Sequence, residues 1–459
     1  MTLDVSRRAF LQRASALSIA GAATPFVMNL AAIGEAAAAT ASDYKALVCV
    51  FMYGGNDYAN TLIPADATNY PLYYNQRPGL GYTQAQIAAT TLKPTVALSG
   101  GQQYALAPEL GGLLPIFNAG KMGVMLNVGT LVQPTTKAQY LANSVPLPPK
   151  LLSHNDQQSY WQSSSPEGAS SGWGGRIGDL LQSGNGTATL TCINPSGNAV
   201  FLTGKSAVQY SVSPAGPIAL NARNSLQGST AAGTFLQTLM RTPVNHQMET
   251  ALSQVTGRAL DLYGSVTTAL AGAPVTTTVF PKSADPSSSL NAQLQEVAKL
   301  ISVSSQLGAK RQVFFVSTGR FDTHDGLVTL HPILMQNISD ALAAFYATTV
   351  ELGVANQVTT FTGSDFGRAL TANNDGTDHG WGSMHFMLGG AVNGGRYYGT
   401  PPLVGNGTTD DIGQGRLIPT TSVDQYAATL ASWFGVSATD MPTVLPNIGN
   451  YTTKTLGFV

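Results

Sequence analysis

Short apolar runs alternate along this chain with segments of helical spacing, and this alternation limits the fold more than any other feature of the sequence. The runs have the length and the β-branched and aromatic content of fully buried strands. They cover Lys45 to Tyr53, Met122 to Val128, Gln312 to Ser317, Gln357 to Thr362 and Met384 to Val392. Helices are predicted at Glu109 to Ala119, from about Leu290 to Leu307, at Pro332 to Leu352 and at Ser422 to Phe434. We expect an α/β fold with a mostly parallel sheet sandwiched by helices, in which the first two strands and their helix form a βαβ unit.

The alternation stops between residues 184 and 289. Thr187 to Ile193 and Ala199 to Leu202 are strand candidates, and a long helical stretch follows from about Ala231 to Leu270. Thr276 to Ser289 is rich in Thr, Pro and Ser and has the composition of a linker. We interpret 184–289 as an inserted cap region between the first part of the core, 40–183, and the second, 290–459.

Composition excludes several classes of protein. Of 459 residues, 43% are hydrophobic and 10% are charged, with 24 acidic and 23 basic side chains. A mature domain of roughly 400 residues with this content buries well over two thirds of its extended-chain surface, so a disordered polyelectrolyte is excluded. No run of five or six like charges is present, so we expect no binding to nucleic acid and no polybasic contact with anionic lipid.

The N-terminus predicts export. Ser6-Arg7-Arg8-Ala9-Phe10-Leu11 is a twin-arginine motif, followed by a weakly apolar stretch from Ala14 to Gly34 and an alanine tract. We interpret 1–39 as a Tat signal peptide, cleaved after Ala39 or Ala41, with the Tat translocase as the partner during export. The alternative is a transmembrane anchor, which the Gly, Ser, Thr, Pro and Asn content disfavours. The mature protein is therefore expected in the periplasm or secreted, without a stable membrane anchor.

The chain has two cysteines, Cys49 and Cys192. An oxidising compartment permits one disulfide between them. Cys49 lies inside an apolar strand, however, so we expect two buried thiols.

Polar residues gather directly after the predicted strands. In an open parallel sheet the chemistry lies at the carboxyl ends of the strands, so these residues would meet at one edge. Five of the six histidines fall in or near these segments. The segments are Gly54 to Asn60, Ser153 to Asp156, Gly319 to Asp325, Ser364 to Arg368 and Gly376 to Trp381.

Carboxylates and imidazoles that converge at one edge offer the oxygen and nitrogen ligands of a hard-to-borderline divalent metal such as zinc, manganese or calcium. The alternative is that each aspartate caps a helix that follows a strand. Taken together the residues favour a metal site. The candidate ligands are Asp57, Asp322, His324, Asp365, Asp378 and His379.

Other polar residues allow two interpretations. His331 and His385 are interpreted as ordinary hydrogen-bonded histidines. Trp161 and the segment Gly172 to Arg176 either line a pocket or pack in the core. Arg320 and Arg368 either clamp an anionic ester or neutralise the neighbouring carboxylates.

Seven short motifs occur in order along the chain, and together they resemble the domain-of-unknown-function 1501 family of Tat-exported bacterial proteins. That family is similar to a distant branch of the alkaline phosphatase and sulfatase superfamily. The resemblance extends over about Lys45 to Phe434. The motifs that carry it are GGND at 54–57, SH at 153–154, GWGGR at 172–176, FDTH at 321–324, TGSDFGR at 362–368, GTDHGWG at 376–382 and GGAVNGG at 389–395.

The resemblance implies roles for individual residues. In the superfamily, two metal ions flank a Ser, Thr or formylglycine nucleophile that attacks phosphorus or sulfur in line. By this resemblance Ser153 is the nucleophile. His154 next to it and Arg368 beside the carboxylates are further catalytic candidates. Asp57 resembles the first-strand metal ligand, Asp322 and His324 resemble ligands of one metal, Asp365 resembles the Asp of an Asp-His-Gly signature, and His379 resembles the late metal-binding His.

The sequence also departs from the superfamily pattern. Phe366 replaces the His of the signature, and the Asp322-to-His324 spacing is shorter than the usual gap. Ser153 follows a loop that contains Pro134, Pro146, Pro148 and Pro149, so the sequence does not assure its place at a helix start. Cys49 precedes GGND and does not stand where formylglycine would form, which disfavours a true sulfatase mechanism.

Two functions follow from these observations. The first is a metal-dependent hydrolase of phosphate or sulfate esters, acting on a small-molecule or polymer substrate. The second is a non-catalytic binding or assembly protein with a degenerate metal site. This alternative is suggested by Phe366, which stands in place of the signature His. Hydrolysis of a carboxylic ester or glycan through Ser153 and His154 lacks a Gly-x-Ser-x-Gly elbow, and nucleotide binding lacks a Walker or Gly-x-Gly-x-x-Gly motif.

Overall fold

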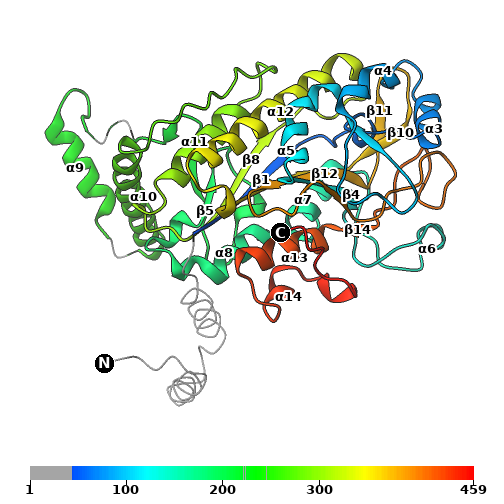
Figure 1. The fold of residues 1–459 in the computed structure, drawn as a ribbon. Helices are drawn as coiled ribbons and strands as arrows, with labels where there is room; N and C mark the ends of the chain where they lie inside the picture. Colours follow the sequence, from blue (N-terminus) through cyan, green and yellow to red (C-terminus); the bar gives the residue numbers. More distant parts are fainter. Residues whose placement is uncertain (1–43, 221, 223, 244–245) are drawn as a thin grey trace, which may run out of the picture.

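The computed structural model describes residues 44–459 except 221, 223 and 244–245. The proposed signal peptide, 1–39, lies outside the described residues. Ten strands of the described chain form one central sheet in the order β13-β4-β12-β9-β1-β8-β5-β6-β7, with β14 paired to β4 (Figure 1). Their bounds are β1 Lys45–Met52, β4 Met122–Gly129, β5 Cys192–Asn194, β6 Tyr210–Ser213, β7 Gly216–Pro217, β8 Arg311–Thr318, β9 Val358–Ser364, β12 Ser383–Gly389, β13 Arg396–Tyr398 and β14 Thr421–Ser422.

The centre of the sheet is parallel. Strand β1 pairs with β8 on one side and β9 on the other, so that Val48 lies opposite both Phe314 and Thr360. Strand β12 runs antiparallel to both β9 and β4. The expected mostly parallel sheet is confirmed. Strands β1 and β4 run in the same direction but are not neighbours, because β9 and β12 from the second part of the chain lie between them.

Helices cover both faces of the sheet. Side chains alternate across β1, so Ala46, Val48 and Val50 face one apolar cluster while Leu47 and Cys49 face the other. Figure 1 shows α11 and α12 on one side of the sheet and α8 and α13 on the other. These helices are α8 Trp173–Leu181, α11 Leu290–Ser302, α12 Leu327–Glu351 and α13 Val423–Phe434.

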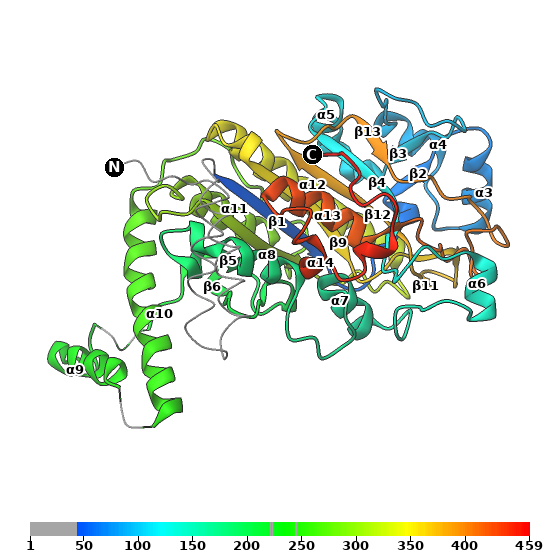
Figure 2. The ribbon, with the colours of Figure 1, turned by 90° about the horizontal axis from the view of Figure 1, so that it is seen from below.

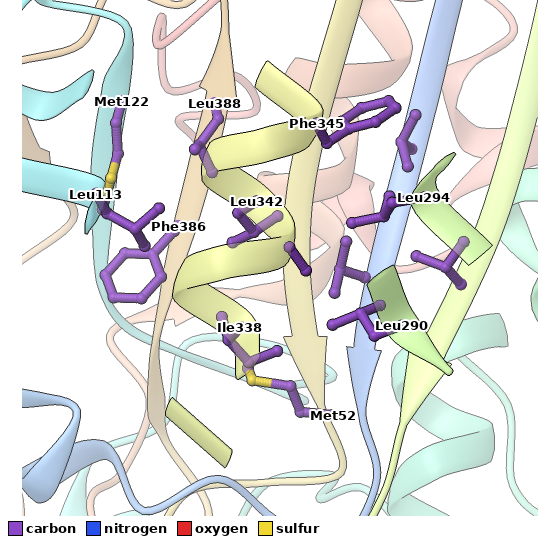
Figure 3. Packing of buried hydrophobic residues seen from close by; sticks show 14 of the residues in the cluster. Met52, Leu113, Met122, Leu290, Leu294, Ile338, Leu342, Phe345, Phe386 and Leu388 are labelled. Atoms are coloured by element: carbon purple, nitrogen blue, oxygen red, sulfur yellow. The ribbon is translucent and has the colours of Figure 1, made fainter. Parts of the chain in front are cut away.

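The core between α12 and the sheet is made of interlocking aliphatic side chains. Figure 3 shows Ile338, Leu342 and Phe345 of α12 directed toward the strands, with Leu290 and Leu294 of α11 beside them. All of these side chains are buried. Each buried side chain of this size contributes about 1.5–3 kcal/mol relative to its exposed state, so this layer fixes the strands whose ends carry the polar loops.

Three elements differ in their bounds or type from the prediction. The helix predicted from Pro332 begins at Leu327, so Pro332 lies inside α12, where it lacks one backbone donor without ending the helix. The helix predicted at Glu109 to Ala119 is a 3-10 turn, Pro108–Leu113, followed by α5, Leu114–Asn118. The strand candidate Ala199 to Leu202 is instead a 3-10 turn, Val200–Leu202.

The segment 184–289 has two parts. Strands β5, β6 and β7 extend one edge of the central sheet. The single long helix predicted there is two helices, α9 Thr230–Arg241 and α10 Gln247–Ala271. Figures 1 and 2 both show α9 and α10 at the opposite end of the molecule from β11, Thr377–His379.

Both cysteines are free and buried, as predicted.

None of the helices in the described ranges is long and apolar enough to cross a membrane.

Candidate metal centre

The polar loops meet where the central parallel strands end. Strand β1 leads into Gly54 and Gly55, β8 leads to Asp322, and β9 leads to Asp365. Helix α7, His154–Ser163, begins at this edge, as does the small ribbon of β10, Arg368–Ala372, and β11. Figure 2 shows α7 near the end of β9. The topological rule that places chemistry at the carboxyl ends of parallel strands therefore applies here.

Three side chains form the centre of this site. His154, Asp322 and His379 each offer one potential ligand atom, and these atoms all lie within 4.8 Å of one another. The Asp322 carboxylate lies between the two imidazoles, with Oδ2 3.3 Å from His154 Nε2 and Oδ1 3.1 Å from His379 Nε2. The three residues come from segments 168 and 57 positions apart, so only the fold brings them together.

The tautomer of His379 is fixed by the backbone. Its Nδ1 lies 2.7 Å from the carbonyl oxygen of Leu152, which can only accept, so Nδ1 carries the proton. Burial lowers the pKa of His379, which favours the neutral ring. The Nε2 lone pair then faces the Asp322 carboxylate, and two acceptors in such proximity favour a cation between them.

His154 is oriented in the same manner by a carboxylate. Its Nδ1 donates to Asp365 Oδ2 at 2.7 Å, and this hydrogen bond raises the pKa of His154. Its Nε2 forms no hydrogen bond within the described chain. A carboxylate that holds one ring nitrogen while the other points into a cluster of acceptors is the usual outer support of a metal-binding histidine.

Asp365 therefore orients His154 and contacts the surrounding loops. Its Oδ2 also accepts from the Gly54 N–H at 3.0 Å and from Gln158 Nε2 at 2.8 Å. Its Oδ1 is buried and has no hydrogen-bond partner among the described residues. The sequence marked Asp365 as a ligand, whereas the structure places the oxygen that faces His154 in an orienting role.

His324 and Asp378 lie at the rim. His324 Nε2 is 2.9 Å from His379 Nε2 and 3.2 Å from Asp322 Oδ1, so it can supply a fourth ligand. Asp378 lies farther out, with Oδ1 3.6 Å from His324 Nδ1, and it accepts a hydrogen bond from Asn373. Both side chains are partly open to solvent.

Arg368 is completely buried and all of its nitrogens are engaged. Nη1 donates to Asp322 Oδ1 at 2.8 Å and to the Gly54 carbonyl, while Nε and Nη2 donate to Thr377. Burial opposes ionisation of Asp322, but the hydrogen bond and charge of Arg368 outweigh it and lower the pKa of that carboxyl. Of the two interpretations of Arg368, the structure favours neutralisation of a carboxylate over a clamp for substrate.

Asp57 stands apart from these residues. Its two oxygens accept from Arg77 Nη1 and Nη2 at 2.6 and 2.7 Å, and both side chains are fully buried. Burial alone would raise the pKa of Asp57, but Arg77 outweighs it and the pKa is lowered. The sequence grouped Asp57 with the ligands because it follows the first strand, and it could not show that Arg77 would saturate the carboxylate.

Ser153 does stand at a helix start. It occupies the N-cap position of α7 without making a side-chain cap, and its Oγ donates to Asp156 Oδ2 at 3.0 Å. Leu152 before it has a φ of 72°, in the left-handed region. In this turn the Leu152 carbonyl points at His379. Backbone strain of this kind is often found at functional sites.

Phe366 packs beside the two imidazoles of the centre, whose ring centroids lie 4.3 Å apart. Its ring centroid lies 4.9 Å from that of His154 and 4.8 Å from that of His379. Gly55 packs against this ring so closely that an added Cβ would lie 2.4 Å from it. The ring thus walls one side of the cluster.

The remaining polar candidates are structural. His331 and His385 are buried and hydrogen-bond to Asn56 and Thr362, as an ordinary core histidine would. Trp161 and Trp173 are buried in the second apolar cluster. Arg320 Nη1 binds Asp285 at 2.9 Å.

The sequence missed the supporting residues. Leu152 acts through its backbone carbonyl and Gln158 through its amide, and neither has a motif of its own. Gln158 is four residues after His154 on α7, and this helical spacing is the one signal that could have placed it on the same face.

A family model described as protein of unknown function (DUF1501) matches residues 44–444. No curated protein matches the chain.

Three solved structures share weak similarity with the chain. Ps i-CgsB, crystallised in complex with k-i-k-neocarrahexaose, is 9% identical over 89% of this chain and 77% of its own, with a TM-score of 0.36. The lipoteichoic acid synthase LtaP from Listeria monocytogenes is 9% identical over 90% of this chain and 78% of its own, at 0.33. The PsFucS1 sulfatase from Pseudoalteromonas sp. is 11% identical over 95% of this chain and 75% of its own, at 0.28.

Proposed function

We propose that this chain, which belongs to the DUF1501 family of proteins of unknown function, is an exported metal-dependent hydrolase of phosphate or sulfate esters. The observation that carries the proposal is the set of converging acceptors formed by His154 Nε2, Asp322 and His379 Nε2. Export through the Tat pathway rests on the twin-arginine motif at Arg7 and Arg8.

The donor set fits a divalent ion. Both imidazoles hold their Nδ1 protons on fixed acceptors, so each can offer a nitrogen lone pair, and Asp322 adds an oxygen. His324, whose Nε2 lies 2.9 Å from His379 Nε2, is the proposed fourth ligand. Imidazole nitrogens suit zinc better than manganese or calcium. An ion of this class supplies charge stabilisation to the oxygens of an ester during displacement.

Ser153 is the proposed nucleophile. It adjoins His154 at the start of α7, and Asp156 accepts its hydroxyl proton in a hydrogen bond. In the proposed reaction Ser153 Oγ bonds to phosphorus or sulfur, its proton passes to Asp156, and the bond to the leaving oxygen breaks. That oxygen takes a proton from solvent water and departs as the alcohol. Water then cleaves the ester on Ser153 and releases phosphate or sulfate. The Asp322–Arg368 contact keeps the carboxylate ionised throughout.

The test combines metal analysis with turnover. The mature protein, purified from its exported fraction, is assayed on p-nitrophenyl phosphate and p-nitrophenyl sulfate before chelation, after chelation and after metal is restored. Asp322→Asn and Ser153→Ala are compared with Asp261→Asn, a change on exposed α10 far from the site. We expect turnover that chelation abolishes, and that both site variants lose by at least ~100-fold while Asp261→Asn keeps it. Turnover that survives chelation and Asp322→Asn would exclude the mechanism.

A second function is kept because of one observation. Phe366 walls the cluster with an apolar ring, and Asp57 is engaged by Arg77, so fewer ligands remain than the sequence suggested. A binding or assembly protein would need only the metal and no turnover. Stoichiometric metal without hydrolysis of either ester class would favour this function.

A further inference from the structure

A long loop connects β13 to β14 and ends near the metal centre. Residues 399–420 contain neither helix nor paired strand, apart from one bridge between Asp411 and Leu417. Loops of this length without secondary structure are uncommon in compact domains and are usually functional when ordered.

Internal hydrogen bonds hold the loop in place. The buried Asp411 carboxylate accepts from the N–H groups of Gly407 and Gly413 at 2.7 and 2.6 Å. The Gly415 carbonyl accepts from the Tyr58 hydroxyl at 3.2 Å, and the Leu417 carbonyl accepts from the Gly382 N–H at 2.9 Å. These contacts tie the residues on both sides of Arg416 to the core.

Arg416 is the one Lys or Arg in this loop, and it lies against the metal centre. Its Nε donates to the carbonyl of His379 at 2.6 Å. Its Nη2 lies 3.7 Å from Asp378 Oδ2, beyond hydrogen-bond distance. Within the described chain, neither terminal nitrogen of Arg416 makes a hydrogen bond, and the side chain is 20% exposed.

Neither of the other arginines near the centre has donors in a comparable position. Arg368 is fully buried, and its contacts with Asp322, Gly54 and Thr377 engage every nitrogen. Arg320 binds Asp285 and is 52% exposed. A guanidinium held at Nε presents its two terminal nitrogens as a fork, which is the geometry that binds two oxygens of an anion.

We propose that Arg416 binds the non-bridging oxygens of the anionic ester at this centre. The inference rests on the proposed hydrolase function and deepens it. An anion approaching Asp322 and Asp378 meets two carboxylates, and the terminal nitrogens of Arg416 are donors that can compensate for them.

The test separates anion binding from support of His379. Arg416→Gln, Arg416→Lys and Arg258→Gln are prepared, the last as a control for loss of one positive charge on α10. Bound metal, KM and kcat for p-nitrophenyl phosphate, and the affinity of the metal-loaded protein for inorganic phosphate by calorimetry are measured. Phosphate binding requires no turnover, so it tests the inference even if no ester is hydrolysed.

We expect Arg416→Gln to keep its metal, to raise KM and weaken phosphate binding by about 10- to 100-fold, and to change kcat much less, because a charge-assisted contact is lost. Arg416→Lys should recover part of the loss, and Arg258→Gln should match the wild type. Unchanged KM and phosphate affinity in Arg416→Gln would overturn the inference, and so would loss of bound metal, since Arg416 would then only position His379. Absence of turnover with phosphate binding that still depends on Arg416 would overturn the hydrolase function alone.

Discussion

Two aspartates that follow neighbouring strands have opposite environments. Asp57, after β1, is 0% exposed, and both of its oxygens are bound by Arg77. Asp322, after β8, is 43% exposed and has imidazole nitrogens of His154, His324 and His379 within 3.3 Å. The Asp57 carboxylate is bound by a guanidinium at both oxygens, whereas Asp322 is bound by Arg368 at Oδ1 alone and also faces imidazole nitrogens.

This difference shows why residue type after a strand does not define a ligand. A carboxylate saturated by a buried guanidinium cannot turn to a metal without leaving a charge unpaired in the core. A carboxylate that shares an open space with imidazole nitrogens can bind a metal ion together with them. We therefore expect the Asp57–Arg77 pair to contribute to stability, and the Asp322 cluster is the proposed functional site.

The largest effect is expected at the Asp57–Arg77 pair, which we call the closed pair; the cluster of Asp322, His154, His324 and His379 is called the open cluster. Asp57→Ala leaves Arg77 buried without its partner and should lower the free energy of unfolding by about 3–5 kcal/mol. His324→Ala, at the open cluster, should cost less than about 1 kcal/mol in metal-free protein. Urea unfolding of both variants measures the difference. Equal losses would contradict the division between the two regions.

Near the closed pair, His331 of α12 contacts Asn56, and its burial predicts that the free energy of unfolding depends on pH. Burial lowers the pKa of His331 from 6.5 to about 4. Between these two values the unfolded chain binds a proton that the folded chain does not, so stability is complete above pH 6.5 and is lost as the pH falls toward 4. The full loss corresponds to about 3 kcal/mol.

Urea unfolding between pH 7 and 4 measures this dependence, and His331→Gln should flatten it. Dependence on pH that remains will include His385, whose pKa burial lowers to about 3. An identical slope in His331→Gln and in the wild type would refute the assignment.

The open cluster should respond to a change that leaves every ligand in place. Asp365→Asn weakens the support of His154 Nδ1, and loss of such support typically costs 10- to 100-fold in metal affinity, or about 1.4–2.8 kcal/mol. Zinc titration of the metal-free protein checks this. Asp378→Asn at the rim is the matched change of one carboxylate, and we expect it to have a smaller effect. Affinity that depends on Asp378 more than on Asp365 would show that the ion binds nearer the rim.

The smallest effect concerns the strained turn that precedes Ser153. Lys150 has a φ of 44°, in the left-handed region, and its side chain is largely exposed. Lys150→Gly should relieve this strain and raise the free energy of unfolding by about 0.5–1 kcal/mol. Lys150→Ala removes the same contact with Asp156 and keeps the strain, so it serves as the control. Thermal unfolding that ranks Ala above Gly would contradict the assignment of strain.

The sequence predicts the central sheet well because its strands are long apolar runs with buried pairing on both sides. Met122 to Val128 and Gln357 to Thr362 were placed within two residues of β4 and β9. The start of α12 was missed because Pro332 ordinarily marks a first helical turn, and the core contacts of Leu327 and His331 extend the helix before it.

The candidate site was predicted in part. The rule that chemistry lies after parallel strands led to Asp322 and His379, because topology alone brings them to one edge. Neither the Arg77 partner of Asp57 nor the Leu152 carbonyl that fixes His379 could be predicted, since both contacts depend on the path of loops whose conformation periodicity does not determine.

Elemental analysis of the exported, mature protein tests the central claim most directly, when wild type and His379→Ala are compared after confirmation that both are folded. The account predicts about one equivalent of a divalent transition metal in the wild type and its loss in His379→Ala. A folded wild type that holds no metal after reconstitution, or a His379→Ala protein that retains the full amount, would contradict it.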